Sequence, residues 1–308
     1  MTTQLSTVQT IDEAGVVGLF VRPSSGGPHP GVIAFGGSGG GLGPAAAWAP
    51  ALAEHGYAVL ALAYFGMPGL PNELRNIDVE VVARAARWLD DQPRIAPTPF
   101  AVMGVSRGSE LAFLAGIHVE RIGPVIALAP SGVGWFALGV DGPVDAPSWI
   151  LDGAPVPYPW PSGGVTTPSS EGPVALRPFF EHLLLDRAGI GRAEIAIEQC
   201  RGPLLLVSGD DDLMWPSTTF AELITERLRR TDATVKCTHL RYPGAGHAFV
   251  GPTGMPVPLE VPAHPLTGAS YAFGGSDVGN AAAQADSWPR IVDFLDSATS
   301  PVARAATS

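Results

Sequence analysis

Basic residues are scarce in this sequence, and lysine is almost absent. Lys236 is the only lysine, and lysine and arginine together number 18 against 29 acidic residues, which leaves a formal net charge of −11. Without a Gly-Lys-Ser/Thr motif there is no phosphate-binding P-loop, and a lysine Schiff base is not expected. Nucleic acids and anionic membranes select for basic patches, so neither is expected as a partner.

Cysteine and long apolar runs are also lacking. Cys200 and Cys237 are the only cysteines; we expect reduced thiols, and a disulfide between them stays an open alternative. No apolar run approaches the ~20 residues that span a bilayer. The start, MTTQLSTVQT, lacks the basic and apolar pattern of a signal peptide. These absences favour a soluble, cytoplasmic protein.

What the sequence does contain is a regular alternation of short apolar runs and longer amphipathic ones. With 46% hydrophobic residues, it predicts an α/β fold: one domain over 1–300, with a mostly parallel central sheet, helices on both faces and a frayed tail at 301–308. The predicted strands are 15–23, 31–37, 57–64, 100–105, 123–131, 202–209 and 234–242. The predicted helices are 44–56, 76–92, 107–117, 177–187, 217–230 and 281–298.

Two stretches break this alternation, at 132–175 and 248–279. The first is rich in Gly and Pro yet contains Trp135, Trp149, Tyr158 and Trp160. Disordered linkers are poor in aromatic residues, so we interpret 132–175 as a lid. Such a lid predicts an apolar acyl pocket. The predicted substrate contacts are Trp135, Trp149, Trp160 and Tyr64, the last at the end of strand 57–64.

The segment AVMGVSRGSELAF places Gly104-Val105-Ser106-Arg107-Gly108 between a predicted strand and a predicted helix. Gly-x-Ser-x-Gly in that context is the nucleophile elbow of α/β-hydrolases. The turn is so tight that only glycine fits at its two ends, and it raises the serine hydroxyl above the sheet edge. We predict that Ser106 is a nucleophile; the alternative is a serine in a glycine-rich turn.

A nucleophilic serine needs an oriented base, and in this fold the acid precedes the histidine in the chain. The loop GDDD after strand 202–209 offers Asp210, Asp211 and Asp212. The usual spacing after Gly209 selects Asp212, with Asp211 as the alternative. YPGAGHAF then supplies His247.

The oxyanion hole should combine the backbone N–H of Arg107 with one from Gly37 or Ser38 in AFGGSGGGLG. A dinucleotide-binding loop is the rival interpretation of this glycine-rich segment. It fails because no Gly-x-Gly-x-x-Gly register fits. We expect no cofactor and no metal ion.

Four stretches carry a more specific resemblance: PGVIAFGGSGGGL, LAEHGYAVLALAYFGMPGLPNEL, GVSRGSEL and GPLLLVSGDDDLMWPS. Over about 28–297 the chain resembles the catalytic domain of the acyl-CoA thioesterase and bile acid-CoA:amino acid N-acyltransferase family. The resemblance implies a triad of Ser106, Asp212 and His247 that attacks a thioester. It also implies transfer of the acyl group to water, or to an amine such as glycine or taurine. In that family thioesterases carry serine and amide-forming members cysteine, so Ser106 favours hydrolysis.

The chain departs from the family pattern at several points. Ser109 replaces a glycine, and Arg107 stands where lysine is common. Arg107 could meet a substrate phosphate or carboxylate, but we favour a pair with Glu110, three residues on. The predicted lid, 132–175, matches the family pattern poorly. The short segment before Pro28 leaves room for one or two extra strands, so the family's amino-terminal β-sandwich is not expected.

The sequence therefore predicts a serine hydrolase acting on an acyl thioester as its small-molecule substrate, carried by CoA or by a carrier protein. Thioesters and esters pass through the same oxyanion, so a carboxylic-ester or dienelactone-type hydrolase is the runner-up. An acyltransferase or cyclase that passes the acyl group to an amine or hydroxyl is the third possibility. A non-catalytic binding protein on the same fold is the fourth.

Overall fold

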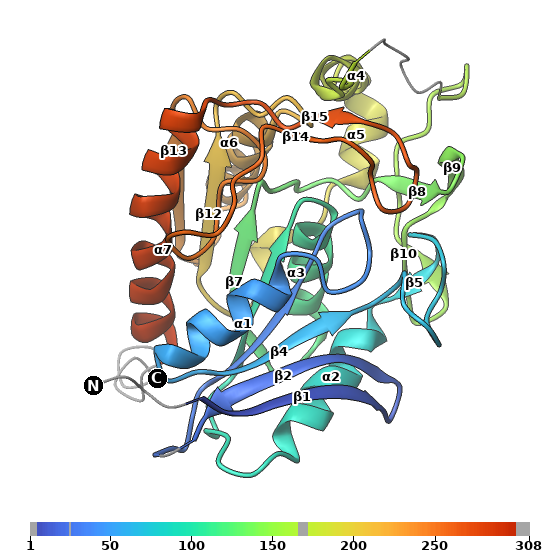
Figure 1. The fold of residues 1–308 in the computed structure, drawn as a ribbon. Helices are drawn as coiled ribbons and strands as arrows, with labels where there is room; N and C mark the ends of the chain where they lie inside the picture. Colours follow the sequence, from blue (N-terminus) through green and yellow to red (C-terminus); the bar gives the residue numbers. More distant parts are fainter. Residues whose placement is uncertain (1–4, 25, 166–171, 300–308) are drawn as a thin grey trace.

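An eight-stranded sheet forms the centre of the molecule (Figure 1). The computed structural model describes residues 5–24, 26–165 and 172–299; the predicted tail 301–308 and part of the predicted lid lie outside them. The strand order is β1-β2-β4-β3-β6-β7-β12-β13. The strands are β1 (Leu5–Glu13), β2 (Val16–Pro23), β3 (Gly31–Phe35), β4 (Ala58–Ala63), β6 (Phe100–Val105), β7 (Ile122–Leu128), β12 (Leu204–Gly209) and β13 (Cys237–Tyr242).

The sheet is mostly parallel, as predicted. All neighbours from β4 to β13 are parallel, whereas β1 pairs with β2, and β2 with β4, in antiparallel register. The predictions missed β1, since its alternation of polar and apolar residues is irregular. Together β1 and β2 are the one or two extra strands that were expected before the core.

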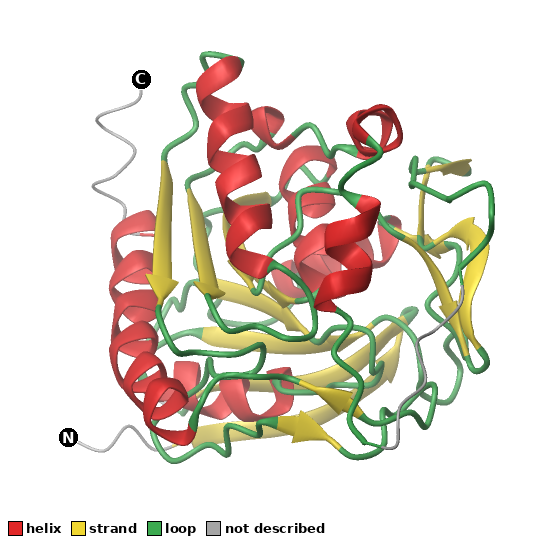
Figure 2. Ribbon diagram, turned by 90° about the horizontal axis from the view of Figure 1, so that it is seen from above, coloured by secondary structure: helices red, strands yellow, loops and turns green. Residues whose placement is uncertain are grey.

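Helices cover both faces of the sheet (Figure 2). The α1 (Ala45–Glu54) and α7 (Asp277–Thr299) helices lie on one face, and α2 (Glu80–Asp90), α3 (Arg107–His118) and α6 (Ser217–Arg230) on the other. Neighbouring strand residues face opposite sides: Val32 belongs to the apolar cluster that contains α1 and α7, and Ile33 to the cluster that contains α2 and α3. Both faces are therefore apolar, which explains the continuous apolar runs of the strands. No described helix has the length and hydropathy that crossing a bilayer requires.

The segment predicted as an irregular lid has more regular structure than expected. It contains a hairpin of β8 (Phe136–Gly139) and β9 (Gly142–Pro147), followed by β10 (Trp149–Leu151) and β11 (Ala154–Pro155). A short strand, β5 (Ile77–Asp78), pairs with β10. The predicted helix 177–187 ends early, as α4 (Arg177–Leu183). A helix that was not predicted, α5 (Arg187–Ala193), follows it before the single turn η1 (Ile197–Gln199). The Asp186 side chain caps α5 by accepting from the Gly189 N–H.

The second irregular stretch, 248–279, crosses the end of the sheet at which the first insertion also lies (Figure 1). It contains the small antiparallel pair β14 (Glu260–Val261) and β15 (Tyr271–Ala272). A bridge between Val174 and Tyr271 connects it to the segment before α4. Parallel strands present their carboxyl ends at one edge, so the loops after β3, β6, β12 and β13 meet there beneath both insertions.

Candidate active site

Ser106 occupies a strained turn between β6 and α3. Its backbone φ is 57° and ψ −125°, and a positive φ is unfavourable for a residue with a side chain. The Ser106 N–H donates to the Leu128 carbonyl at the end of β7, 2.9 Å away. A Cβ atom on Gly104 would lie 2.2 Å from the Gly108 carbonyl oxygen, and one on Gly108 2.2 Å from that of Gly36. The turn therefore requires glycine at both ends, as the motif predicted.

The loops after β12 and β13 bring Asp212 and His247 together. His247 Nδ1 lies 2.8 Å from Asp212 Oδ2, and a carboxylate only accepts, so this nitrogen carries the proton. The other oxygen, Oδ1, accepts from the Met214 and Trp215 N–H groups at 2.9 and 3.1 Å. Asp212 is fully buried, whereas Asp211 is exposed. Of the two candidate acids, Asp212 is thus the one in contact with His247.

The glycine-rich loop after β3 packs directly against Ser106. A Cβ atom on Gly37 would lie 3.0 Å from the Ser106 Cβ. The Tyr64 hydroxyl contacts the Gly36 and Gly37 carbonyls at 2.9 and 3.0 Å and holds the loop in place. Arg107 is the first residue of α3, so its N–H has no acceptor within the helix. The glycine-rich loop and the first turn of α3 thus lie on either side of Ser106, where the oxyanion hole is predicted.

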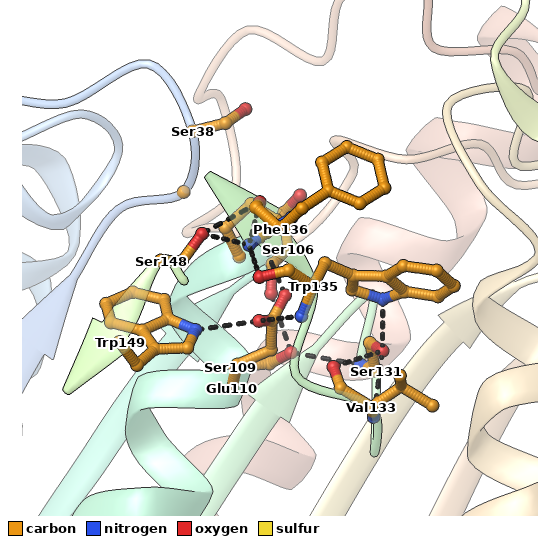
Figure 3. Close-up of polar contacts among 12 residues, drawn as sticks. Ser38, Ser106, Ser109, Glu110, Ser131, Val133, Trp135, Phe136, Ser148 and Trp149 are labelled. Atoms are coloured by element: carbon orange, nitrogen blue, oxygen red, sulfur yellow. Dashed lines mark hydrogen bonds and ion pairs between the residues drawn. The ribbon is translucent and has the colours of Figure 1, made fainter. Parts of the chain in front are cut away.

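The Arg107 side chain does not point to solvent but forms a buried pair with Glu110, as favoured from the sequence. Figure 3 shows Glu110 with its other partners, Trp135 and Trp149. Arg107 Nε lies 2.8 Å from Glu110 Oε1. Arg107 Nη2 donates to the carbonyls of Trp135 and Phe136 and to Ser148 Oγ. The residue after the nucleophile thereby anchors the hairpin β8–β9.

Glu110 completes this network from the other side. Its Oε2 accepts from the Trp135 N–H at 3.1 Å and from the Trp149 indole N–H at 2.7 Å. Burial raises the pKa of Glu110 to about 7, although Arg107 and the two tryptophan donors oppose this rise. Burial also lowers the pKa of Arg107. Ser109, the other departure from the family pattern, donates to the Ser106 carbonyl at 2.6 Å and supports the elbow.

Two cavities meet at Ser106. The smaller, of about 70 Å³, is lined by Ser38, Ser106, Arg107, Phe136, Leu138, Pro143, Val165, Leu176, Phe179, Phe180, Met214, Trp215, His264 and Tyr271. The larger, of about 580 Å³, shares Ser38, Ser106, Met214 and His264 with it and adds Gly37, His247 and residues of the loops after β3 and β13.

The four aromatic residues predicted as substrate contacts do not line either cavity, and that prediction is corrected. Trp135 is 0% exposed and donates its indole N–H to Ser131. Trp149 donates its indole N–H to Glu110, and Tyr64 donates its hydroxyl to the Gly37 carbonyl in the glycine-rich loop after β3. Trp160 packs on the Phe136 ring from behind, with ring centroids 5.1 Å apart. The three tryptophans of the first insertion therefore lie behind the wall of the smaller cavity. Of the described aromatic residues in that insertion, Phe136 is the one that lines the cavity.

His264 is a residue that sequence reasoning missed. It lies in the second insertion, is buried, and lines both cavities. Its Nε2 lies 3.1 Å from the Ser38 hydroxyl, and burial lowers its pKa to about 4. A neutral histidine therefore faces the predicted oxyanion loop. In the sequence, His264 lies in a stretch without helical or strand periodicity, so no pattern marks it as a site residue.

Cys200 and Cys237 are both free thiols, as expected. Burial raises their pKa values to about 12 and about 11, which makes both poor nucleophiles. Among the described residues, no group of three or more His, Cys, Asp or Glu side chains is placed to hold a metal ion.

Comparison with known proteins confirms the resemblance predicted from the sequence. Residues 171–301 match the family model described as BAAT / Acyl-CoA thioester hydrolase C terminal. This part includes Asp212 and His247 and excludes Ser106.

Individual relatives align over nearly the whole chain. Acyl-coenzyme A amino acid N-acyltransferase 1 of Mus musculus is 29% identical over 93% of this chain and 64% of its own length. Peroxisomal succinyl-coenzyme A thioesterase of Mus musculus is 26% identical, over 90% and 62%. Acyl-coenzyme A thioesterase 6 of Homo sapiens is 28% identical, over 90% and 62%. The chain thus spans less than two thirds of the length of these relatives.

Among solved structures, the chain is similar to a dienelactone hydrolase-like promiscuous phosphotriesterase from metagenomic libraries. The TM-score is 0.51 at 17% identity, and the match covers 96% of this chain and 99% of that one. At this identity the likeness shows the fold alone, which is the predicted α/β-hydrolase fold.

Proposed function

We propose that this chain is a serine hydrolase that cleaves an acyl thioester through an acyl-enzyme on Ser106. The observation that carries the proposal is the buried Asp212–His247 hydrogen bond, with His247 in the same cavity as a strained elbow serine. The names of the relatives, which are acyl-CoA thioesterases and acyltransferases, support a thioester as substrate.

In the first half-reaction, Ser106 Oγ attacks the thioester carbonyl carbon while His247 Nε2 takes its proton. The oxyanion forms against the N–H groups of Arg107 and the Gly37–Ser38 loop, each worth roughly 3 kcal/mol. The C–S bond then breaks, and His247 returns the proton to the departing thiolate. Asp212 keeps the imidazole in the required tautomer and stabilises its charged form.

In the second half-reaction, water attacks the acyl-enzyme carbonyl, His247 takes its proton, and Ser106 is regenerated as the acid leaves. The larger cavity supports water as the acceptor. Its wall includes His247 and the exposed residues Pro256, Pro258 and Pro265, so this cavity reaches solvent. Serine at position 106, rather than cysteine, agrees with this choice.

The experiment measures thiol release from hexanoyl-CoA and phenol release from p-nitrophenyl hexanoate. We expect turnover of the thioester to fall by at least about 10⁴-fold in Ser106→Ala. Ser297→Ala, which changes an exposed serine on α7, serves as the matched control and should keep full activity. Efficient ester turnover without thioester turnover would favour the carboxylic-ester hydrolase instead.

An acyltransferase is the second candidate, because four relatives are named as N-acyltransferases. Glycine or taurine added to the same assay separates the two functions. Hydrolysis predicts free hexanoic acid as the product at every amine concentration. An amide product, with thiol release that depends on the amine, would replace hydrolysis by transfer. The cytoplasmic location stays a prediction, since the relatives include a peroxisomal and a mitochondrial protein.

A further inference from the structure

We infer that the two cavities at Ser106 divide the substrate: the smaller binds a short, uncharged acyl chain, and the larger binds the leaving group. The inference rests on the proposed hydrolase function and specifies its substrate. Both cavities include Ser106 and Ser38 in their walls, so a carbonyl carbon at the serine hydroxyl has space on two sides.

The position of His247 decides which side takes which half. His247 must give its proton to the leaving sulfur or oxygen, so the leaving group must lie on the His247 side. His247 lines the larger cavity and is absent from the described wall of the smaller one. The acyl chain is therefore directed into the smaller cavity.

The size of the smaller cavity limits the length of the acyl chain. None of its described lining residues is exposed, and they come from both insertions. Its volume is about 70 Å³, against about 580 Å³ for the larger cavity. The smaller cavity therefore suits a short acyl chain, and we take hexanoyl as the expected length limit to be tested.

The chemistry of the wall selects an uncharged chain. Away from the serine the wall is formed by Phe136 and Leu138 of the hairpin, Phe179 and Phe180 of α4, and Tyr271 of β15. Arg107 is the only cation in the described wall. Its charge is balanced by Glu110, and its guanidinium holds Trp135, Phe136 and Ser148. A carboxylate at the end of the chain would be buried without a partner, which is strongly unfavourable.

The test is a series of straight-chain acyl-CoA thioesters from acetyl to dodecanoyl, with the same chains as p-nitrophenyl esters. Burial of each methylene contributes about 0.8 kcal/mol, so kcat/KM should rise about fourfold per added carbon up to about hexanoyl and then fall. Phe179→Ala removes a half-buried ring from the wall and should move the optimum to a chain at least two carbons longer. Phe294→Ala makes the same change at a half-buried position on α7, outside both cavities, and should leave the optimum unchanged.

The charge preference is tested with glutaryl-CoA against hexanoyl-CoA at pH 8. We expect kcat/KM for the glutaryl chain to be at least about a hundredfold lower. A preference for glutaryl would show that Arg107 is available to the substrate and would overturn the uncharged-chain assignment.

The two proposals fail in different ways. The proposed hydrolase function is wrong if thioester turnover survives in Ser106→Ala. If turnover depends on Ser106 but shows no chain-length optimum, or if Phe179→Ala and Phe294→Ala give the same optimum, the division of the cavities is wrong and the proposed function stands. An identical optimum for thioesters and esters is expected, since only the leaving group differs; different optima would also contradict the inference.

Discussion

At the scale of single residues, Asp212 holds His247 with one carboxylate oxygen and is itself held by two backbone N–H groups through the other. Asp212→Asn would favour the wrong imidazole tautomer and should lower kcat about 10⁴-fold while the fold is kept. Asp211→Asn changes an exposed neighbour and should alter kcat by less than about threefold. Steady-state kinetics of both variants with hexanoyl-CoA checks this, and equal losses would reject Asp212 as the triad acid.

Glu110 makes stability depend on pH with a defined sign. Its pKa is raised from 4.5 to about 7 in the folded chain, so between these values the folded state binds more protons than the unfolded state. The free energy of unfolding must then fall as pH rises from about 4.5 to 7, by about 3 kcal/mol for this group.

Urea unfolding at pH 5, 6, 7 and 8 measures this contribution. Glu110→Gln cannot titrate, so its stability should fall less between pH 5 and 8 than that of the wild type. Glu226→Gln, which changes an exposed glutamate paired with Arg229, should follow the wild-type curve. Parallel curves for all three proteins would show that Glu110 does not titrate in this range.

At the scale of elements, the nucleophile elbow tolerates no side chain at its glycines. In Gly108→Ala the new Cβ would meet the Gly36 carbonyl oxygen at 2.2 Å, and backbone cannot move aside cheaply. We expect a loss of about 3 kcal/mol or more. Gly191→Ala, on α5 with nothing within 4 Å of the new Cβ, should instead be neutral or stabilising by up to about 1 kcal/mol. Thermal unfolding of the two variants is the comparison, and similar midpoints would contradict this account of the elbow.

The elements also show why some predictions held and others did not. The α6 helix spans Ser217–Arg230, as predicted, because its apolar residues repeat at helical spacing along one face. The hairpin β8–β9 was missed because its alternation is interrupted by Gly139 and Gly142, which pair with each other at the turn; Gly142 has a φ of 111°. The predicted helix at 177–187 ends at Leu183, and Asp186 caps a separate helix that was not predicted. Local spacing cannot distinguish these outcomes.

At the scale of the whole molecule, the parallel sheet was predictable and the substrate cavity was not. The order of Ser106, Asp212 and His247 along the chain, each after a predicted strand, is a local signal. The cavity wall instead combines Phe136, Phe179, Trp215 and Tyr271 from segments far apart in sequence. No pattern links them, since they meet only where the two insertions fold over the sheet (Figure 1). The tryptophans predicted as substrate contacts therefore lie near the smaller cavity but behind the residues that line it.

The central claim is that Ser106 carries the acyl group, and one labelling measurement tests it most directly. A hexyl fluorophosphonate mimics the oxyanion: Ser106 Oγ would attack phosphorus, fluoride would leave, and His247 would take the proton. Peptide mass spectrometry locates the label while residual hexanoyl-CoA hydrolysis is measured on the same samples. The account predicts one label per chain on Ser106, with loss of hydrolysis in direct proportion, and no label in Ser106→Ala. Hydrolysis that survives complete labelling of Ser106, or a label at another residue that accompanies the loss, would contradict it.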